Sequence, residues 1–354
     1  MLSLSSASRI FNFSKSGDNC SSDPEPYVPL SVKIFTASVI VVLALIGALI
    51  VVVNSLVISM VYKKKTLRSF TNLFLGSLAL SDLVTGLVGV PLLLVCINMI
   101  RADICISSVI LFRLTGISSI CHVLLIDFDR YFAIVHPYRR ASHMTKRRAI
   151  CAICLVWVFA CLSSAIQLSW DNLNFGDASE FEESVDINIG YSIICLVLFF
   201  LVPLLLMCFI YGRIFYISFK IAKNDRDLQD ALLRGSRAVH REWRGRSVLV
   251  IMVVIFGGCW LPFFLAMLND HSNEPDSTPS LIWVQRLLSV LGFIPPLTNP
   301  LLCTLAKKDF RQVLRGMIFK YKCRQKYRER AHDPLHHYAA HSSQSESIIN
   351  TTTL

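Results

Sequence analysis

The stretch Ile34 to Tyr62, IFTASVIVVLALIGALIVVVNSLVISMVY, contains no charged side chain. A helix needs about 20 mainly apolar residues to cross the hydrocarbon core of a bilayer, so this stretch is long enough to span a membrane. Similar stretches follow it, separated by short polar segments. The seven run from Ile34 to Tyr62, Asn72 to Met99, Cys105 to Val135, Ala149 to Leu168, Ile189 to Ile221, Ser247 to Met267 and Leu281 to Leu305. The sequence therefore predicts an all-α integral membrane protein, with a seven-transmembrane helix bundle over residues 34–305.

The composition indicates that lipid is the solvent of this bundle. Apolar residues make up 54% of the 354 and charged residues 17%, whereas roughly a quarter of an ordinary soluble domain is charged. A buried helix of a soluble protein would explain any single stretch, but it does not explain seven in succession.

The positive charges predict the orientation. Lys and Arg beside membrane spans are retained in the cytoplasm. Of the 35 such residues, 29 fall on every second connection between spans and on the C-terminal part, which are therefore assigned to the cytoplasm. The exceptions are Arg9, Lys15, Lys33, Arg101, Arg113 and Arg286. Residues 1–33 are therefore expected to be extracellular at the plasma membrane, with the first span as the targeting signal. The net charge of +11 then reflects topology and contact with anionic membrane lipids, and no nucleic-acid partner is expected.

Strongly polar groups at membrane depth are costly, so each is a functional candidate. They are Asn54, Asp82, Arg113, Asp127, Asp129 and Asn299. Asp82 lies in the middle of the second span, where two interpretations stay open. It belongs to a cation site, or it is a neutral carboxyl group hydrogen-bonded inside the bundle.

Short motifs occur in order through the seven spans. They are Asn54; Leu78-Ala-Leu-Ser-Asp82; Asp129-Arg130-Tyr131; Trp157; Pro203 with Tyr211; Phe256 with Cys259-Trp260-Leu261-Pro262; and Asn299-Pro300. In this set the chain, from about Ile34 to Lys322, resembles the rhodopsin-like G-protein-coupled receptors. The resemblance implies a receptor and not an enzyme. Such a receptor binds an extracellular ligand and activates heterotrimeric G proteins as the sixth helix moves outward.

The resemblance also implies an ion-pair latch at the inner end of the third helix. Arg130 stands between Asp129 and Tyr131, and Glu242 precedes the sixth helix, where the family often has an acidic partner. A buried ion pair is costly to break, which suits a contact with two positions. Ordinary surface pairing is the alternative. Neutralising Glu242 is expected to raise ligand-independent signalling.

A second part of the implied switch lies in the core. Pro262 removes a backbone hydrogen bond and bends the sixth helix next to Trp260. Ile120, Pro203 and Phe256 match the family's core switch, although plain core packing would also explain them.

The family's sodium pocket corresponds to Asp82, Ser119 and Asn299, so a sodium ion is the one allosteric cofactor expected. Two departures bear on this pocket and on the switch. Pro295 and Pro296 stand where polar residues often complete the pocket. The seventh helix reads Asn299-Pro300-Leu-Leu-Cys303, without the tyrosine that normally meets Tyr211.

Cys105 matches the family cysteine at the outer end of the third helix. The segment Asp171 to Asn188 contains no cysteine to pair with it, so the resemblance leaves Cys20 as the expected partner, with two free thiols as the alternative. Cysteines inside the spans, Cys96 among them, are expected to be small apolar packing groups. Sequons predict glycosylation at Asn12 and Asn19.

The family's ligand pocket maps onto a largely aromatic wall. Its residues are Phe112, Arg113, Cys195, Phe199, Trp260, Phe263, Phe264, Met267, Ser289 and Phe293. Amine receptors have an aspartate where Phe112 is followed by Arg113, and opsins have a lysine at Phe293, so neither an amine nor retinal is favoured.

Two signals point to different ligands. Arg113 and Arg286 are suited to clamp a carboxylate or phosphate, while acidic residues in the segment Asp171 to Asn188 would attract a cationic peptide. The ligand is therefore expected to be a peptide or a small anionic or lipid-like molecule. An arginine paired to that acidic segment is the alternative.

On the cytoplasmic side, residues 306–323 are expected to form a short amphipathic eighth helix on the membrane, with palmitoylation at Cys323. Residues 324–354 form a tail of polar composition that is expected to be disordered. Its serines suit receptor kinases and arrestin, and Thr352-Thr353-Leu354 resembles a ligand of PDZ domains.

Two other classes of protein fit less well. A transporter usually shows repeats between its halves, and none is visible. A seven-span metalloenzyme needs histidine ligands, and His122 is the only histidine inside a predicted span.

Overall fold

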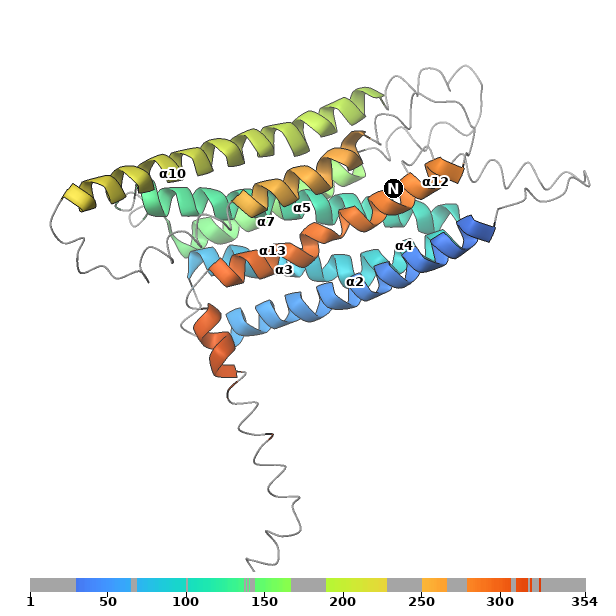
Figure 1. The fold of residues 1–354 in the computed structure, drawn as a ribbon, viewed down its shortest axis with the longest axis horizontal. Coiled ribbons are helices and arrows are strands. Elements are labelled where there is room, and N and C mark those ends of the chain that lie inside the picture. Colours follow the sequence, from blue (N-terminus) through green and yellow to red (C-terminus); the bar gives the residue numbers. More distant parts are fainter. Residues whose placement is uncertain are drawn as a thin grey trace, which may run out of the picture. The chain divides into compact units, whose positions relative to one another are not determined.

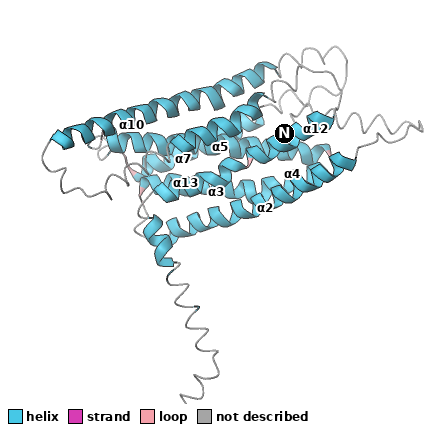
Figure 2. Ribbon diagram, viewed as in Figure 1, coloured by secondary structure: helices cyan, strands magenta, loops and turns pink. Residues whose placement is uncertain are grey.

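The structure is a computed structural model. It describes residues 30–64, 69–99, 101–136, 144–166, 189–227, 250–265, 279–306 and 310–317, with positions 138, 140, 319 and 325. The regular structure in these ranges is helical (Figure 2). Within them, five helices are long and apolar enough to cross a membrane, and Val250–Leu265 is a shorter apolar helix.

The helices lie in all seven predicted spans (Figure 1). The first four spans are α2 (Leu30–Lys63); α3 (Phe70–Val84), η2 (Thr85–Gly89) and α4 (Val90–Met99) in succession; α5 (Ala102–Val135); and α7 (Lys146–Ala165). The fifth begins at Ile189 and continues through η3 (Val197–Leu201) into α10 (Val202–Asp227), the sixth is Val250–Leu265, and the seventh is α12 (Pro279–Gly292) with α13 (Ile294–Ala306). The predicted fold class is confirmed.

Local sequence explains where several helices begin and bend. The hydroxyl of Ser69 accepts a hydrogen bond from the backbone N–H of Asn72 and caps α3, and Thr145 caps α7 in the same way through Arg148. Single π-helical turns, η2 and η3, interrupt the second and fifth spans. Such turns are a known cause of bends and often mark functional positions.

The third span, α5, is the central helix. It packs against α3, α4, α7 and α10, while α2 packs against α3, α12 and α13. Gly86 in η2 faces α2 so closely that a Cβ there would lie 2.9 Å from Cγ2 of Ile50 and 3.1 Å from the carbonyl oxygen of Gly47. Large apolar side chains such as Leu45, Leu155 and Leu205 are exposed, as the lipid-facing surface of a membrane bundle requires.

A buried polar chain joins the second, third and fourth spans. The indole N–H of Trp157 donates to Ser77 Oγ at 3.1 Å, and Ser77 Oγ lies 2.8 Å from His122 Nε2. His122 Nδ1 lies 2.7 Å from the carbonyl oxygen of Ser118. Because a carbonyl oxygen can only accept, Nδ1 carries the proton and Ser77 donates to Nε2. The only histidine in a span thus has a structural role, which agrees with the absence of a metalloenzyme pattern.

Residues 307–354 form a second compact unit. Residues 310–317 of this unit are helical, within the stretch predicted as the eighth helix. The predicted palmitoylation site Cys323 and the serines and PDZ-like end of the tail lie outside the described residues.

Candidate ligand pocket and switch residues

A cavity lies between α5 and the fifth and sixth spans. Its lining residues are Phe112, Arg113, Gly116, Ile117, Ile120, Tyr191, Cys195, Phe199, Trp260, Phe263 and Phe264. Seven of the ten predicted pocket residues are among them. Tyr191 was missed, although its spacing of four residues before Cys195 and eight before Phe199 places it on the same face of the fifth span.

Aromatic rings form one wall of this cavity. The ring centroid of Phe112 lies 6.0 Å from Trp260, 5.6 Å from Phe263 and 5.5 Å from Phe293. Phe293 therefore supports the wall from behind Phe112. Aromatic pairs at these separations pack favourably in tilted and edge-to-face arrangements.

The packing of Trp260 against α5 depends on a glycine. A Cβ on Gly116 would lie 2.9 Å from Cη2 of the indole ring, closer than real Cβ atoms approach a neighbour. The absence of a side chain at Gly116 thus allows Trp260 to lie directly against the third span.

Arg113 is the one permanently charged residue among the described residues that line the cavity. Its Cζ lies 5.5 Å from the ring centroid of Tyr191, a cation–π separation. Its Nη1 is buried and has no hydrogen-bond partner among the described residues. Because the described lining residues include no carboxylate, this nitrogen is suited to pair with an anionic group.

The other predicted pocket features are not among the described lining residues of this cavity. Ser289 is buried but does not line the cavity. Arg286 has a buried Nε without a hydrogen-bond partner within the described ranges. Met267 and the acidic segment 171–188 lie outside the described residues.

The predicted sodium-pocket residues come together beneath Trp260. Asn299 Nδ2 donates to Ser119 Oγ at 3.0 Å, and both side chains lie close enough to affect the carboxyl group of Asp82. Asp82 is fully buried, and neither of its oxygens makes a well-formed hydrogen bond in the part of the chain that the structure describes. Buried oxygens without donors fit a small cation, to which Ser119 and Asn299 would add two further oxygens.

Asn54, another of the polar residues singled out in the sequence, fastens the first span to the seventh. Asn54 Nδ2 donates to the carbonyl oxygens of Ile50 at 2.9 Å and Pro296 at 3.2 Å. Proline has no N–H but keeps its carbonyl acceptor. Pro296 therefore still provides a polar contact at a position where the side chain cannot.

At the inner end of α5, the structure differs from the predicted latch. Asp129 pairs with Arg140, with 2.9 Å between Oδ1 and Nε, and also accepts a hydrogen bond from Thr71. No ion pair joins Asp129 to Arg130 among the described residues. The expected Asp129–Arg130 pair is therefore corrected: Arg140 reaches the same carboxylate from beyond the helix end. Glu242 lies outside the described residues.

Tyr131 and Tyr211, the two tyrosines of the predicted switch, have different surroundings. Tyr131 is half-buried, with its ring centroid 5.6 Å from Phe132. The hydroxyl of Tyr211 is buried and donates to Asp127 Oδ1 at 2.7 Å. This bond joins α10 to α5.

Two of the three residues of the predicted core switch lie at one cavity. Ile120 and Phe256 both line a second cavity, which Trp260 also lines. Pro203 lies two residues after the end of η3, and in that π-helical turn Phe200 stacks on Phe256 with 5.8 Å between ring centroids. Proline 262 lies inside the sixth-span helix and Pro300 inside α13, where each removes a backbone hydrogen bond.

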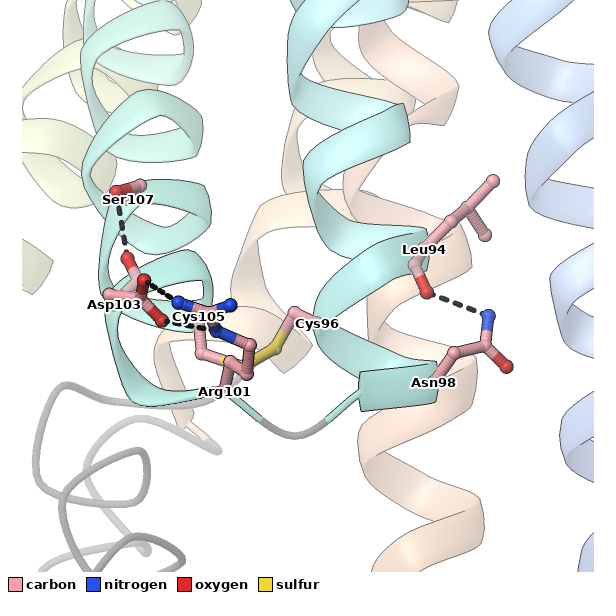
Figure 3. The surroundings of a disulfide bond; sticks show 7 residues. All are labelled: Leu94, Cys96, Asn98, Arg101, Asp103, Cys105 and Ser107. Atoms are coloured by element: carbon pink, nitrogen blue, oxygen red, sulfur yellow. Dashed lines mark hydrogen bonds and ion pairs between the residues drawn. A yellow bond between two sulfur atoms is a disulfide. The ribbon is translucent and has the colours of Figure 1, made fainter.

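The predicted disulfide partner of Cys105 is wrong. Cys105 is bonded to Cys96, nine residues earlier (Figure 3). The short connection after α4 brings the start of α5 beside Cys96, and Arg101 in this connection forms an ion pair with Asp103 at 2.8 Å. Cys20 lies outside the described residues, as do the sequons at Asn12 and Asn19.

Comparison with known proteins agrees with this arrangement. Residues 53–302 match the family model of the 7 transmembrane receptor (rhodopsin family). The chain is 28% identical to the histamine H2 receptor of Homo sapiens over 77% of each chain. It is 30% identical to the human adenosine receptor A2a over 91% of this chain and 81% of the receptor.

The neuromedin-U receptor 2 of Mus musculus is similar as well, at 29% identity over 78% of this chain and 74% of that receptor. The family match covers more than half of the chain, and the ordered motifs, the helical bundle and the relatives all agree with it. This chain belongs to the rhodopsin family of seven-transmembrane G-protein-coupled receptors.

Proposed function

We propose that this receptor recognises an extracellular ligand that carries an anionic group on an apolar or aromatic body. The observation that supports the proposal is Arg113, which lines an aromatic cavity with a buried Nη1 and has no carboxylate beside it among the described lining residues. A carboxylate or phosphate would pair with the guanidinium, and the aromatic wall would cover the rest of the ligand. A lipid-like acid and the free carboxyl end of a peptide share this chemistry.

The relatives do not select a ligand. Their names refer to histamine, adenosine and neuromedin U, which differ in charge and size. The described lining residues include no acid to hold an ammonium group, and the resemblance puts Phe293 at the position of the retinal-binding lysine. The proposal therefore follows the chemistry of the cavity.

A screen of paired ligands in cells that express the chain would test this ligand class. Aromatic acids, fatty acids and peptides with free carboxyl ends are compared with their esters or amides, using a panel of G proteins as the readout. We expect acids to activate and their neutral partners to fail. Arg113→Gln should weaken an active acid by about ten-fold to a hundred-fold, since a charge-assisted bond contributes roughly 1.5–3 kcal/mol.

Arg101 provides the matched control. It is an exposed arginine just before the same helix, paired to Asp103, so Arg101→Gln removes an identical charge without changing the cavity. Equal loss of potency in both variants would indicate long-range attraction in place of direct binding. Activation by amines, with no effect of Arg113→Gln, would contradict the proposed ligand class.

For signal transmission, we propose outward movement of the inner end of the sixth helix. Pro262 weakens the helix next to Trp260, and Trp260 lines both cavities. A ligand that shifts the indole would change the packing of Ile120 and Phe256 below it. Packed cores move between discrete arrangements, so a small shift can be amplified.

Further assignments are proposed from the resemblance alone. The N-terminus faces outward at the plasma membrane and is glycosylated at Asn12 and Asn19. Cys323 is palmitoylated, and the tail engages receptor kinases, arrestin and a PDZ domain. Sodium bound by Asp82, Ser119 and Asn299 favours the resting state.

A further inference from the structure

Asp127 is a buried acid that has no role in the switch described above. It lies on α5 three residues before Arg130 and is fully buried. Its Oδ1 accepts the hydroxyl of Tyr211 at 2.7 Å, and its Oδ2 has no hydrogen-bond partner among the described residues. A buried carboxylate with an unsatisfied oxygen is costly in a membrane protein. Stability alone therefore gives no reason for an acid at this position.

Arg130 is the nearby group that can satisfy Asp127. Its Nη2 is also buried without a hydrogen-bond partner in the described part of the chain, and its charge acts on the Asp127 carboxyl group. Asp129, the acid next to Arg130, is already paired with Arg140. Arg130 thus lies within electrostatic reach of an acid one helical turn earlier, without a direct ion pair to it among the described residues.

Tyr211 comes to the same acid from another helix. The seventh helix has Cys303 where the family has the tyrosine that meets Tyr211. In this structure the hydroxyl of Tyr211 instead reaches across from α10 to Asp127. A single carboxylate therefore contacts the fifth span and lies within electrostatic reach of the arginine of the switch.

We propose that Asp127 is the positioning residue of the resting state. It holds Tyr211 by a hydrogen bond and Arg130 by charge, and activation requires that both be released so that the inner end of α10 can separate from α5. The proposal rests on the receptor function above. It gives the role of holding Tyr211 and Arg130 in the resting state to Asp127 instead of Asp129 or Glu242.

The test uses the full chain in lipid nanodiscs without added ligand. Asp127→Asn keeps the size and an acceptor for Tyr211 but removes the charge that faces Arg130. Tyr211→Phe removes only the hydroxyl. We expect Asp127→Asn to raise G-protein nucleotide exchange about five-fold or more, within the usual range of couplings between sites. The effect of the double variant should be smaller than the sum of the two single effects, because both substitutions act on one contact.

Asp103→Asn is the matched control, since Asp103 is an exposed acid at the outer end of the same helix. It should leave nucleotide exchange unchanged. If Asp127→Asn folds poorly, Tyr211→Phe carries the test, because it keeps the ring and its packing. If Asp127→Asn and Tyr211→Phe both stimulate G-protein nucleotide exchange at the wild-type rate, the proposal is overturned.

A distance measurement tests the role of Asp127 independently of the proposed coupling to G proteins. Spin labels on the exposed residues Ile150 of α7 and Phe219 of α10, introduced as non-natural amino acids, report the separation of the inner helix ends. Asp127→Asn should populate a longer distance even without a G protein. A longer distance with no exchange on any G protein would support the anchor and contradict the proposed coupling. Unchanged distances in Asp127→Asn and Tyr211→Phe would overturn the anchor whatever the G-protein result.

Discussion

Arg140 holds the carboxylate of Asp129, with 2.9 Å between Nε and Oδ1 and 3.2 Å between Nη2 and Oδ2. Its Nη2 also donates to Thr71 Oγ1 at 3.2 Å. The acid beside Arg130 is therefore neutralised by an arginine from beyond the third helix. This arrangement leaves Arg130 without that acid as a partner in the described part of the chain.

Arg140→Ala should lower ligand-independent G-protein activation, because the freed Asp129 becomes available to restrain Arg130. Asp129→Asn should leave basal activity unchanged or raise it. The unpaired buried carboxylate in Arg140→Ala should also cost about 1–3 kcal/mol of stability, visible as a lower Tm. Arg140→Lys keeps the charge and serves as the control. Higher basal activity in Arg140→Ala would show that the Arg140 pair itself holds the resting state.

Gly116→Ala should alter the resting position of Trp260, since the new Cβ would lie 2.9 Å from the indole ring. Overpacking of this kind costs about 1–3 kcal/mol, so Tm should fall and basal G-protein activation should change. Gly212→Ala is the matched control, because a Cβ there meets nothing within 4 Å. Similar behaviour of the two variants would argue against a close contact between Gly116 and Trp260.

Cys96→Ser should lower the stability of the purified receptor by about 2–3 kcal/mol, the usual effect of a bridge that closes a short loop. Cys208→Ser, at an exposed free cysteine of the fifth span, should have little effect. Peptide mapping without reduction should recover Cys96 joined to Cys105. A peptide joining Cys20 to Cys105 would contradict the structure.

Sodium should raise the Tm of the wild-type receptor relative to the same concentration of choline, because the cation would neutralise the buried Asp82. Asp82→Asn should abolish this difference, and Ser119→Ala should reduce it. Asp103→Asn should retain it, since that acid lies at the outer surface. A sodium effect that persists in Asp82→Asn would place the ion elsewhere.

The spans were predictable because hydropathy and charge placement depend on local sequence. The family motifs then indicated most of the pocket, and the structure brings Phe112, Arg113, Phe199 and Trp260 to one cavity as expected. Each span is a regular helix, so the position of a motif along its span is enough to predict which side chains point toward the cavity.

Pairings between distant side chains were not predictable from single residues. Tyr211 and Asp127 are separated by 84 positions, and the sequence marked both without relating them. The partner of Asp129 was missed because Arg140 lies past the helix end, where the path of the chain decides which acid it reaches. Cys96 was missed because its position inside a hydrophobic stretch suggested packing.

The bond between Cys96 and Cys105 also bears on engineering of the outer face. Since each cysteine is used within one short connection, the cysteine-free segment Asp171 to Asn188 carries none of the covalent framework seen in the described structure. An exchange of that segment for one of another length or charge would therefore leave the Cys96–Cys105 bond untouched.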